Sequence, residues 1–380
     1  MKKGSICYVV SSEMTVASFL RPHITRATET YDVTVAANTE RGDLLTELGL
    51  RAALLKVPIA RHIRPFQDLA ALWTLFRAFR VRRFRIVHSV SPKAGLLGML
   101  AARLARVPVR IHTFTGQVWA TRRGWRRVLL KATDRMLAAL TTHPLVDSPS
   151  QLDFLVAEGI LPAGKAAVIG KGSICGVDTE RFRPDAESRA AVRAGLGISG
   201  DAFVMLFLGR LNRDKGIPDL FDAFAALAAR RKDCVLLLVG PDEGGMLERI
   251  ADLGSDACDR VRHVAYTRQP ERYMAAADVF CLPSYREGFG MAVVEAAAAC
   301  LPAVASRIYG ITDAVSEGQT GLLHPPGDVP AIVAAVGRLA DAPEERRAMG
   351  ENARTRVLAE FSEEKVTQGL IAHYEKITTP

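Results

Sequence analysis

The segment Glu287–Glu295 places two carboxylates on either side of a glycine-containing turn. The turn follows an apolar run, Val279–Leu282, which predicts a buried strand, and it opens a helical pattern that begins at Met291. The first turn of a helix presents free backbone N–H groups and the positive end of the helix dipole, which together suit a diphosphate. We therefore expect Glu295, one turn inside the helix, to accept hydrogen bonds from ribose hydroxyls, and Glu287 to face a sugar.

A second loop that could do chemistry is Gly209–Gly216, which carries Arg210 and Lys215. It follows the predicted strand Phe203–Leu208 and precedes another helical pattern. A guanidinium binds phosphate oxygens in a bidentate way, and an ammonium acts as a compact point charge. The two cations together can neutralise a diphosphate leaving group. That task otherwise falls to a metal ion, for which the chain has no convincing D-x-D motif.

A single histidine, His112, stands near the end of the predicted strand Val109–Thr113. At the carboxyl end of a strand, its ring could form a hydrogen bond with a sugar hydroxyl. A lone histidine is more often structural, so His112 is a candidate only together with the two loops above.

The elements that must position these residues alternate between short apolar runs and helical patterns. In the first half the predicted strands are Ser5–Val10, Asp32–Ala37, Ala53–Val57, Arg85–Val90, Val109–Thr113 and Leu145–Asp147. The predicted helices between them include Asp68–Phe79, Lys93–Arg106 and Gly124–Leu140. This alternation predicts right-handed βαβ units and a parallel sheet.

The same alternation starts again after the glycine-rich stretch Gly170–Gly176, with a predicted hinge near residues 176–200. We predict an α/β protein of two Rossmann-like, doubly wound domains that face a cleft, with ligands at the carboxyl ends of the strands. The predicted divisions are an N-terminal domain over residues 1–176 and a C-terminal domain over residues 177–357. An amphipathic helix over residues 358–380 is expected to cross back to the first domain.

Charge is unevenly distributed over the 380 residues, whose net charge is +9. Residues 1–176 hold 26 Lys and Arg against 11 Asp and Glu, whereas residues 177–380 hold 24 against 30. A basic first half indicates an anionic partner for that half. On charge alone, nucleic acid, an anionic membrane and a phosphorylated substrate all remain open.

The positions of the cysteines and the hydropathy of the chain predict the cellular compartment of the protein. The six cysteines lie mostly in apolar segments and form no C-x-x-C pair, which favours reduced core cysteines in the cytoplasm over zinc or disulfides. No apolar run reaches the roughly 18 residues of a spanning helix. The run Ile6–Val10 is too short for a signal core and predicts a first buried strand instead.

Arg210, Lys215, Glu287 and Glu295, in their strand and turn contexts, resemble the donor-site pattern of glycosyltransferase family 4, which has the GT-B fold. The resemblance covers nearly the whole chain, and His112 matches the family's histidine near the donor sugar. A narrower branch contains bacterial transferases that extend undecaprenyl-diphosphate-linked sugars, typically from UDP-sugars. The stretches that resemble this branch are Phe19–His23, Ser91–Leu96 and His112–Trp119.

The resemblance implies that residues 1–176 bind the acceptor and that residues 177–357 bind the nucleotide sugar, and it gives each site residue a role. Arg210 and Lys215 would stabilise the departing nucleotide diphosphate, and Glu287 would contact the donor sugar. Glu295 would hold the ribose, and the amides of Gly290 and Met291 would cap a phosphate. The implied catalytic set is His112, Arg210, Lys215 and Glu287, and the implied donor-binding set is Phe289, Gly290, Met291 and Glu295.

The resemblance also implies the reaction. The family retains the anomeric configuration, which is explained by same-face attack in which the leaving phosphate helps remove the acceptor proton. No enzymic nucleophile, metal or cofactor is then needed. The implied reaction transfers a sugar, such as an N-acetylhexosamine, from a UDP-sugar to a polyprenyl-diphosphate-linked saccharide during surface polysaccharide or glycan assembly.

Two basic stretches agree with such an acceptor. One spans Arg77–Arg85, and the other, Trp119–Lys131, combines arginines with two tryptophans. We expect a peripheral position on the inner face of the cytoplasmic membrane, where basic and aromatic side chains suit anionic lipid; a solvated basic face is the alternative. The residues expected at the acceptor or membrane surface are Lys93, Arg122, Arg123, Arg126 and Arg127. Nucleic acid is not expected, since no helix-turn-helix, zinc or RNA-binding signature is present.

Two positions depart from the family pattern. Ser11–Thr15 stands where many members have a glycine-rich loop, and Cys175 stands where the narrower branch has asparagine. Two other functions remain open at this point. One is a GT-B transferase with a soluble acceptor, such as a thiol precursor or a sugar phosphate. The other is a non-catalytic protein that binds a nucleotide sugar or nucleic acid, against which the four donor-site residues argue.

Overall fold

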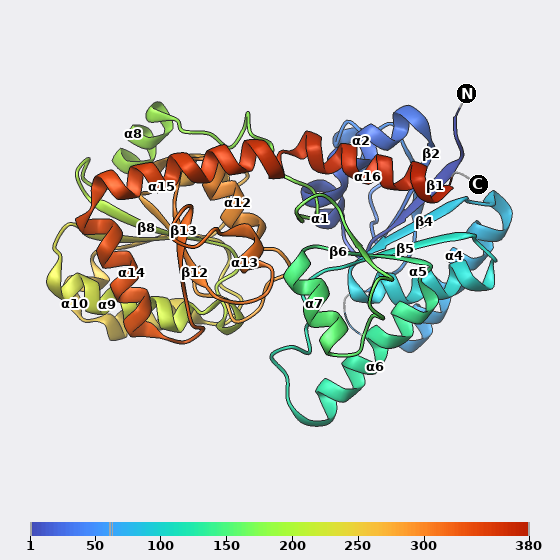
Figure 1. The fold of residues 1–380 in the computed structure, drawn as a ribbon, viewed down its shortest axis with the longest axis horizontal. Helices are drawn as coiled ribbons and strands as arrows, with labels where there is room; N and C mark the ends of the chain where they lie inside the picture. The colour runs from blue at the N-terminus through green and yellow to red at the C-terminus, as the bar shows by residue number, and fades with distance from the viewer. Residues whose placement is uncertain (1, 61, 63, 379–380) are drawn as a thin grey trace. The chain divides into compact units, whose positions relative to one another are not determined.

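The computed structural model describes residues 2–60, 62 and 64–378 of the chain (Figure 1). The chain divides into two compact units. Unit 1 consists of Met1–Gly176 together with Glu363–Pro380, and unit 2 consists of Val177–Ser362. Each unit is built around its own parallel sheet, as the alternation of strands and helices predicts.

The described part of unit 1 contains a seven-stranded sheet in the order β3-β2-β1-β4-β5-β6-β7. All neighbouring strands run parallel. The strands are β1 (Ser5–Val9), β2 (Asp32–Ala37), β3 (Ala53–Lys56), β4 (Ile86–Val90), β5 (Val109–Phe114), β6 (His143–Val146) and β7 (Ala167–Val168). The interior strand β1 is buried on both faces, which explains its continuous apolar run.

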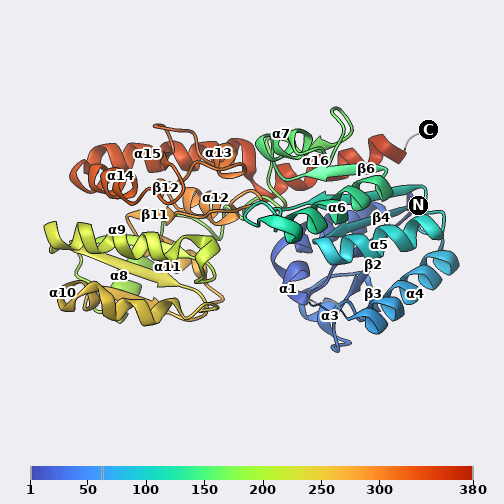
Figure 2. The same ribbon diagram turned by 90° about the horizontal axis from the view of Figure 1, so that it is seen from below.

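Helices cover both faces of this sheet (Figure 2). One face packs against α4 (Pro65–Arg82), α5 (Pro92–Leu104), α6 (Gly124–Leu140) and α7 (Pro149–Ala157). The other packs against η1 (Val16–Leu20), α2 (Arg21–Thr30), α3 (Leu44–Glu47) and α16 (Glu363–Thr378), with the short α1 (Glu13–Thr15) before them. Residues on β1 alternate between the two cores, since Cys7 and Val9 belong to the first and Tyr8 to the second.

The last helix, α16, packs beside α2 in unit 1, which confirms the predicted return of the chain (Figure 1). Its buried Tyr374 hydrogen-bonds to His88 Nδ1 at 2.5 Å and donates to Tyr8 Oη at 3.1 Å. Two turns earlier along the helix, Thr367 Oγ1 lies 3.1 Å from His23 Nδ1. These buried polar contacts fix the register of α16 on the sheet, because a displaced helix would leave them unpaired.

The described part of unit 2 contains a six-stranded parallel sheet in the order β10-β9-β8-β11-β12-β13. Its strands are β8 (Phe203–Leu208), β9 (Cys234–Val239), β10 (Val261–Val264), β11 (Val279–Leu282), β12 (Ala303–Ser306) and β13 (Gly321–His324). Its helices are α8 (Ala186–Gly195), η2 (Arg213–Lys215), α9 (Ile217–Arg230), η3 (Met246–Leu253), α10 (Ser255–Cys258), α11 (Pro270–Ala276), α12 (Met291–Ala298), α13 (Ile311–Ala314), α14 (Val329–Asp341), α15 (Pro343–Arg356) and η4 (Val357–Phe361). A single apolar cluster fills the unit.

Two observations bear on the compartment predictions. None of the six cysteines, all of which the structure describes, takes part in a disulfide, and four of them are buried. Among the described residues, no helix combines the length and the apolarity needed to cross a bilayer.

Candidate active site

The candidate donor residues of unit 2 lie at the point where its strand order reverses. The chain runs from β8 outward through β9 and β10 in one direction, and from β11 through β12 and β13 in the other. The carboxyl ends of β8 and β11 are therefore the crevice in which doubly wound sheets bind ligands. The loop after β8 carries Arg210 and Lys215, and the loop after β11 carries Glu287.

An ion pair joins these two loops. Lys215 Nζ lies 2.5 Å from Glu287 Oε1, and Ser284 Oγ donates to the same oxygen at 2.8 Å. Both partners of the pair are mostly buried, with side-chain exposures of 20% and 12%. Arg210 differs, because its guanidinium is 45% exposed and pairs with Glu243 at 3.0 Å. No sequence motif identifies Ser284 or Glu243 as a residue of the site.

Gly216 allows the close approach of the two loops. Its backbone has a left-handed φ of 69°, and a Cβ at this position would lie 2.0 Å from the carbonyl oxygen of Pro283. No side chain fits in that space, so glycine is required where the turn of η2 passes the end of β11. The Asn212 side chain accepts from the Lys215 backbone N–H at 3.1 Å and fixes the same turn.

The helix α12 begins directly after the second loop, as the sequence predicts. Gly290 is its N-cap residue, with φ 82° and ψ 52°. Phe289 is buried and its ring packs against Phe361 with centroids 5.3 Å apart, so it anchors the turn within unit 2. Met291, the first helical residue, is half-buried.

Glu295 lies in the second turn of α12 and differs from the other carboxylates of the site. It is half-buried, and no residue that the structure describes forms a hydrogen bond with its side chain. Burial raises the pKa of Glu295 to about 7, while Arg181 lowers it and Glu271 raises it. A carboxylate held without a protein donor is suited to accept hydrogen bonds from a ligand.

The strand order of unit 1 reverses between β1 and β4. The loops after these strands meet there, since Ser11 Oγ and Ser91 Oγ lie 3.0 Å apart. Ser91 has φ 77° and ψ 143°, a strained conformation for a residue with a Cβ. The segment Ser11–Thr15 lacks the glycines that many family members have there, but nothing in the sequence indicates this serine pair. Lys93, one residue into α5, is mostly buried and pairs with Asp68 at 2.6 Å.

His112 lies inside unit 1, at only 2% exposure, and not at an open strand end. Its Nδ1 hydrogen-bonds to Ser89 Oγ at 2.8 Å, and its ring meets Phe114 edge-on at 4.7 Å between centroids. Gly95 gives the ring its room, since a Cβ there would lie 2.5 Å from Cε1. Burial lowers the pKa of His112 to about 3, so the ring is neutral at physiological pH and its Nε2 is the remaining hydrogen-bonding group.

A cavity of about 60 Å³ lies next to His112, under helix α6. Trp119 forms one wall, and its indole N–H donates to Asp134 Oδ2 at 2.7 Å. The Trp119 ring also stacks on Phe154 at 5.3 Å between centroids. Burial raises the pKa of Asp134 to about 6. The hydrogen bond from the Trp119 indole lowers this pKa, but its effect is smaller than that of burial. The segment after β5 is thus held by a buried contact that the sequence did not reveal.

The basic residues at the start of α6 separate into two groups. Arg122, Arg123 and Arg126 are exposed. Arg127, in contrast, pairs with Glu158 at 2.8 Å and lies over the Trp119 ring at 5.4 Å from its centroid. Arg127 therefore takes part in holding Trp119, whereas the other three arginines are open to solvent.

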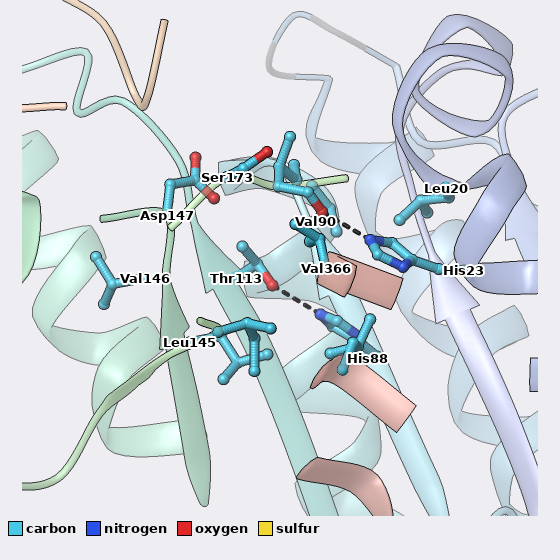
Figure 3. Close-up of a pocket in the computed structure, with 13 residues that line it drawn as sticks. Leu20, His23, His88, Val90, Thr113, Leu145, Val146, Asp147, Ser173 and Val366 are labelled. Atoms are coloured by element: carbon cyan, nitrogen blue, oxygen red, sulfur yellow. Dashed lines mark hydrogen bonds between the residues drawn. The ribbon is translucent and has the colours of Figure 1, made fainter. Parts of the chain in front are cut away.

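A second, smaller pocket in unit 1 lies between the sheet and α16 (Figure 3). In it, His88 Nε2 hydrogen-bonds to Thr113 Oγ1 at 2.8 Å, and Asp147 lies beside Ser173. Asp147 is buried and burial raises its pKa to about 8. The cavity is only about 20 Å³, room for roughly one water molecule, so it is too small for a sugar.

Two family models match the chain. "Glycosyl transferase 4-like domain" matches residues 25–172, and "Glycosyl transferases group 1" matches residues 188–356. Among the described residues, no group of three or more His, Cys, Asp or Glu side chains is arranged to hold a metal ion.

Three curated relatives are similar over most of their length. The capsular polysaccharide biosynthesis glycosyltransferase CapM of Staphylococcus aureus is 28% identical, over 84% of this chain and 83% of that protein. The UDP-Gal:alpha-D-GlcNAc-diphosphoundecaprenol alpha-1,3-galactosyltransferase of Escherichia coli is 27% identical, over 88% and 86%. The D-inositol 3-phosphate glycosyltransferase of Streptomyces scabiei is 32% identical, over 77% and 69%.

Solved structures share the fold. A sucrose-phosphate synthase of Thermosynechococcus elongatus has a TM-score of 0.80 at 23% identity and covers 98% of this chain and 99% of that one. The HepE protein of Anabaena, solved with UDP and glucose, has a TM-score of 0.80 at 18% identity, with 98% and 99% covered. The two doubly wound units have the GT-B fold, and the two family models define the chain as a glycosyltransferase. The chain belongs to glycosyltransferase family 4.

Proposed function

We propose that this glycosyltransferase moves a sugar from a UDP-sugar to a polyprenyl-diphosphate-linked saccharide, with retention of configuration and without a metal ion. The observation that carries the donor half of the proposal is the gathering of Arg210, Lys215, Glu287 and Glu295 around the ends of β8 and β11. The complex of HepE with UDP and glucose supports a UDP-linked donor.

Each donor-site group has a chemical task in this reaction. The diphosphate takes Arg210 and Lys215 in place of their present partners, Glu243 and Glu287, and meets the N-terminus of α12 at Gly290. Glu287, released from the ammonium, accepts hydrogen bonds from the donor sugar. Glu295 accepts hydrogen bonds from the ribose.

The bond changes need no protein nucleophile. The bond between the anomeric carbon and the phosphate oxygen breaks, and the acceptor oxygen forms its bond on the same face. The acceptor proton passes to the leaving phosphate oxygen. The main contribution of the protein is to stabilise the negative charge that develops on the diphosphate. Arg210 and Lys215 provide this stabilisation. We assign His112 Nε2 to hydrogen bonding with the donor sugar, as a neutral ring.

The acceptor proposal rests on the relatives and on two helix faces. CapM is named for capsular polysaccharide, and the Escherichia coli relative for a diphosphoundecaprenol acceptor. On α6, Trp125 and Val128 are 71% and 68% exposed beside the exposed arginines. On α4, Phe66, Leu69 and Trp73 are 92%, 65% and 62% exposed at helical spacing. Exposed aromatic faces flanked by arginines suit an anionic lipid surface on the inner face of the cytoplasmic membrane.

A panel of nucleotide sugars, assayed with a synthetic polyprenyl-diphosphate sugar, tests the proposal. We expect transfer from a UDP-sugar, resistance to EDTA, and a product with the anomeric configuration of the donor. An enzyme that regained activity only with magnesium or manganese would contradict metal independence, and an inverted product would contradict retention.

A soluble acceptor is the second candidate, because the Streptomyces scabiei relative is named for D-inositol 3-phosphate. The same panel should therefore include inositol phosphates, sugar phosphates and a small thiol precursor. Transfer to one of these, with none to the lipid-linked acceptor, would replace the first proposal with the second.

A further inference from the structure

Unit 1 carries an arginine-lined hollow at the edge of its sheet opposite the carboxyl ends of β1 and β4. The hollow has a volume of about 500 Å³ and lies where α4 and α5 end and β4 and β5 begin. Strand amino ends line this edge, whereas Ser11 and Ser91 follow the carboxyl ends of β1 and β4. The lining residues are Phe79, Arg80, Arg83, Phe84, Arg85, Ala105, Arg106, Val107 and Pro108.

The four arginines of the hollow lack acidic partners. No carboxylate lines it, and none of the four forms an ion pair with a described residue. Arg85 donates to the backbone oxygen of Thr378 at the end of α16. The nearby Glu375 pairs with Lys3 at 2.6 Å. The ends of the two helices contribute about half a negative charge each, far less than four guanidinium charges. The hollow is therefore left with excess positive potential.

Two of these arginines occupy a backbone conformation that favours glycine. Arg83 ends α4 with φ 50°, and its N–H donates to the oxygen of Phe79 at 3.1 Å. Arg106 follows α5 with φ 60°, and its N–H donates to the oxygen of Arg103 at 3.0 Å. These are the left-handed positions after a helix, where a residue with a Cβ costs free energy.

Other helix ends in this chain use glycine at the same position. The glycines are Gly49 after α3, Gly159 after α7 and Gly197 after α8, all with φ between 63° and 70°. The half-buried Cys300 after α12 is an exception, as it lies within the packed interior beside α15. Arg83 and Arg106 are exposed, so packing does not explain them. Strain kept at exposed positions points to a role for the side chains.

We propose that this hollow is a binding site for a phosphate group, with Arg83 and Arg106 as its principal ligands and Arg80 and Arg85 as supporting cations. Guanidinium groups match phosphate oxygens in a bidentate way, and several of them together suit a doubly charged anion. The phosphate can belong to a phospholipid headgroup or to a free phosphate compound. The site goes beyond the proposed transfer reaction and requires no donor-site residue.

The test uses the double variant Arg83→Asn/Arg106→Asn, because asparagine tolerates the left-handed conformation and removes both charges. The control, Arg51→Asn/Lys171→Asn, removes two exposed cations of unit 1 that form no ion pair with a described residue. Without ligand, we expect the double variant to melt at or above the temperature of the wild type. If it is unstable, Arg80→Gln serves as a second variant that leaves both helix ends unchanged.

Two measurements separate the sources of the phosphate. Inorganic pyrophosphate is titrated calorimetrically, and vesicles with or without phosphatidylglycerol are used in flotation. Loss of about tenfold or more in pyrophosphate affinity, in the double variant alone, would assign the site to a free phosphate compound. A selective loss of binding to phosphatidylglycerol vesicles would assign it to a lipid headgroup. Equal behaviour of the double variant and the control in both measurements would overturn the proposal.

Discussion

At the scale of single residues, the two donor-site cations, Lys215 and Arg210, each pair with a carboxylate. Lys215 is fixed by Glu287 at 2.5 Å, within a mostly buried pair. Arg210 is more exposed and pairs with Glu243. A diphosphate that displaces these carboxylates would meet cations whose positions are already set, which lowers the reorganisation needed during the reaction.

The replacement of Lys215 by alanine tests this arrangement. We expect the transfer rate to fall about 100–1000-fold, as for the loss of one group that stabilises a developing anion. Arg210→Ala should have a similar effect on the rate. The matched control is Arg213→Ala, which removes an exposed charge from the same turn. Initial transfer rates at saturating donor would be compared. Unchanged rates in a Lys215→Ala/Arg210→Ala enzyme would exclude the binding of the diphosphate by these two cations.

Glu295 predicts a pH dependence of donor binding. Its pKa is raised to about 7, and only the ionised carboxylate accepts hydrogen bonds at both oxygens. Protonation as the pH falls below 7 therefore removes the competent form, and the KM for the donor should rise about fivefold between pH 7 and pH 6.

Two variants separate this effect from other titrations. Glu295→Gln should have a high KM that no longer changes over this range. Glu271→Gln should shift the midpoint to lower pH without flattening the profile, because Glu271 raises the pKa of Glu295 and its removal also frees Arg181. If Glu295→Gln kept the wild-type pH profile, Glu295 would not be the titrating group.

At the scale of elements, the turn between η2 and α9 depends on one glycine. A Cβ at residue 216 would meet the backbone oxygen of Pro283 at 2.0 Å, in addition to the strain of its φ of 69°. Gly318 has a similar φ of 72° but open space around it. Gly318→Ala should therefore lower the free energy of unfolding by about 1–2 kcal/mol, through backbone strain alone.

Gly216→Ala should lower the free energy of unfolding by more than Gly318→Ala, because a backbone oxygen cannot move aside as a flexible side chain can. It should also reduce the transfer rate, since it displaces Lys215 from Glu287. Urea unfolding and initial rates measure the two effects. Equal losses of stability in both variants would mean that the loops after β8 and β11 can move apart without a loss of free energy.

The elements themselves could largely be predicted from the sequence. The apolar run Phe203–Leu208 and the pattern Gly124–Leu140 match β8 and α6 residue for residue. The two-residue strand β7 was missed because Ala167–Val168 is too short to give a periodic pattern. The helix α15 could not be predicted from an apolar pattern, because its sequence is mostly polar, with only a narrow buried face at Met349, Gly350 and Ala353.

The site was less predictable than the elements. Arg210, Lys215 and Glu287 follow strands that could be recognised, so their grouping followed from topology. The burial of His112 could not be foreseen, since it depends on Gly95 of a different element and on Ser89 of the neighbouring strand. The pairing of Arg127 with Glu158 is likewise a tertiary contact between α6 and the segment after α7.

At the scale of the whole molecule, the basic character of unit 1 predicts salt-sensitive membrane binding. Reversal of the exposed Arg122, Arg123 and Arg126 to glutamate should weaken binding to anionic vesicles by about 100-fold or more, at about 1 kcal/mol for each lost cation. Arg127 is left unchanged, because it supports Trp119. Binding of the wild type should fall steeply with added salt.

The control for this experiment reverses three exposed arginines of unit 2, Arg183, Arg230 and Arg268. It changes the net charge equally but leaves α6 intact. Vesicle flotation at several salt concentrations measures the effect, and hydrolysis of free donor should stay unchanged in both variants. Similar losses in the two variants would show that net charge, and not α6, drives membrane binding.

The return of α16 to unit 1 has a consequence for biosynthesis. The ribosome completes all seven strands of that sheet before residue 177, but Leu370 and Tyr374, which cover one of its faces, emerge only after residues 177–362. At the usual rates of elongation this delay is roughly 10–40 s. During that time one apolar face of the nascent sheet, together with His88, lacks its final cover, so we expect this half-built unit to be the species that chaperones engage.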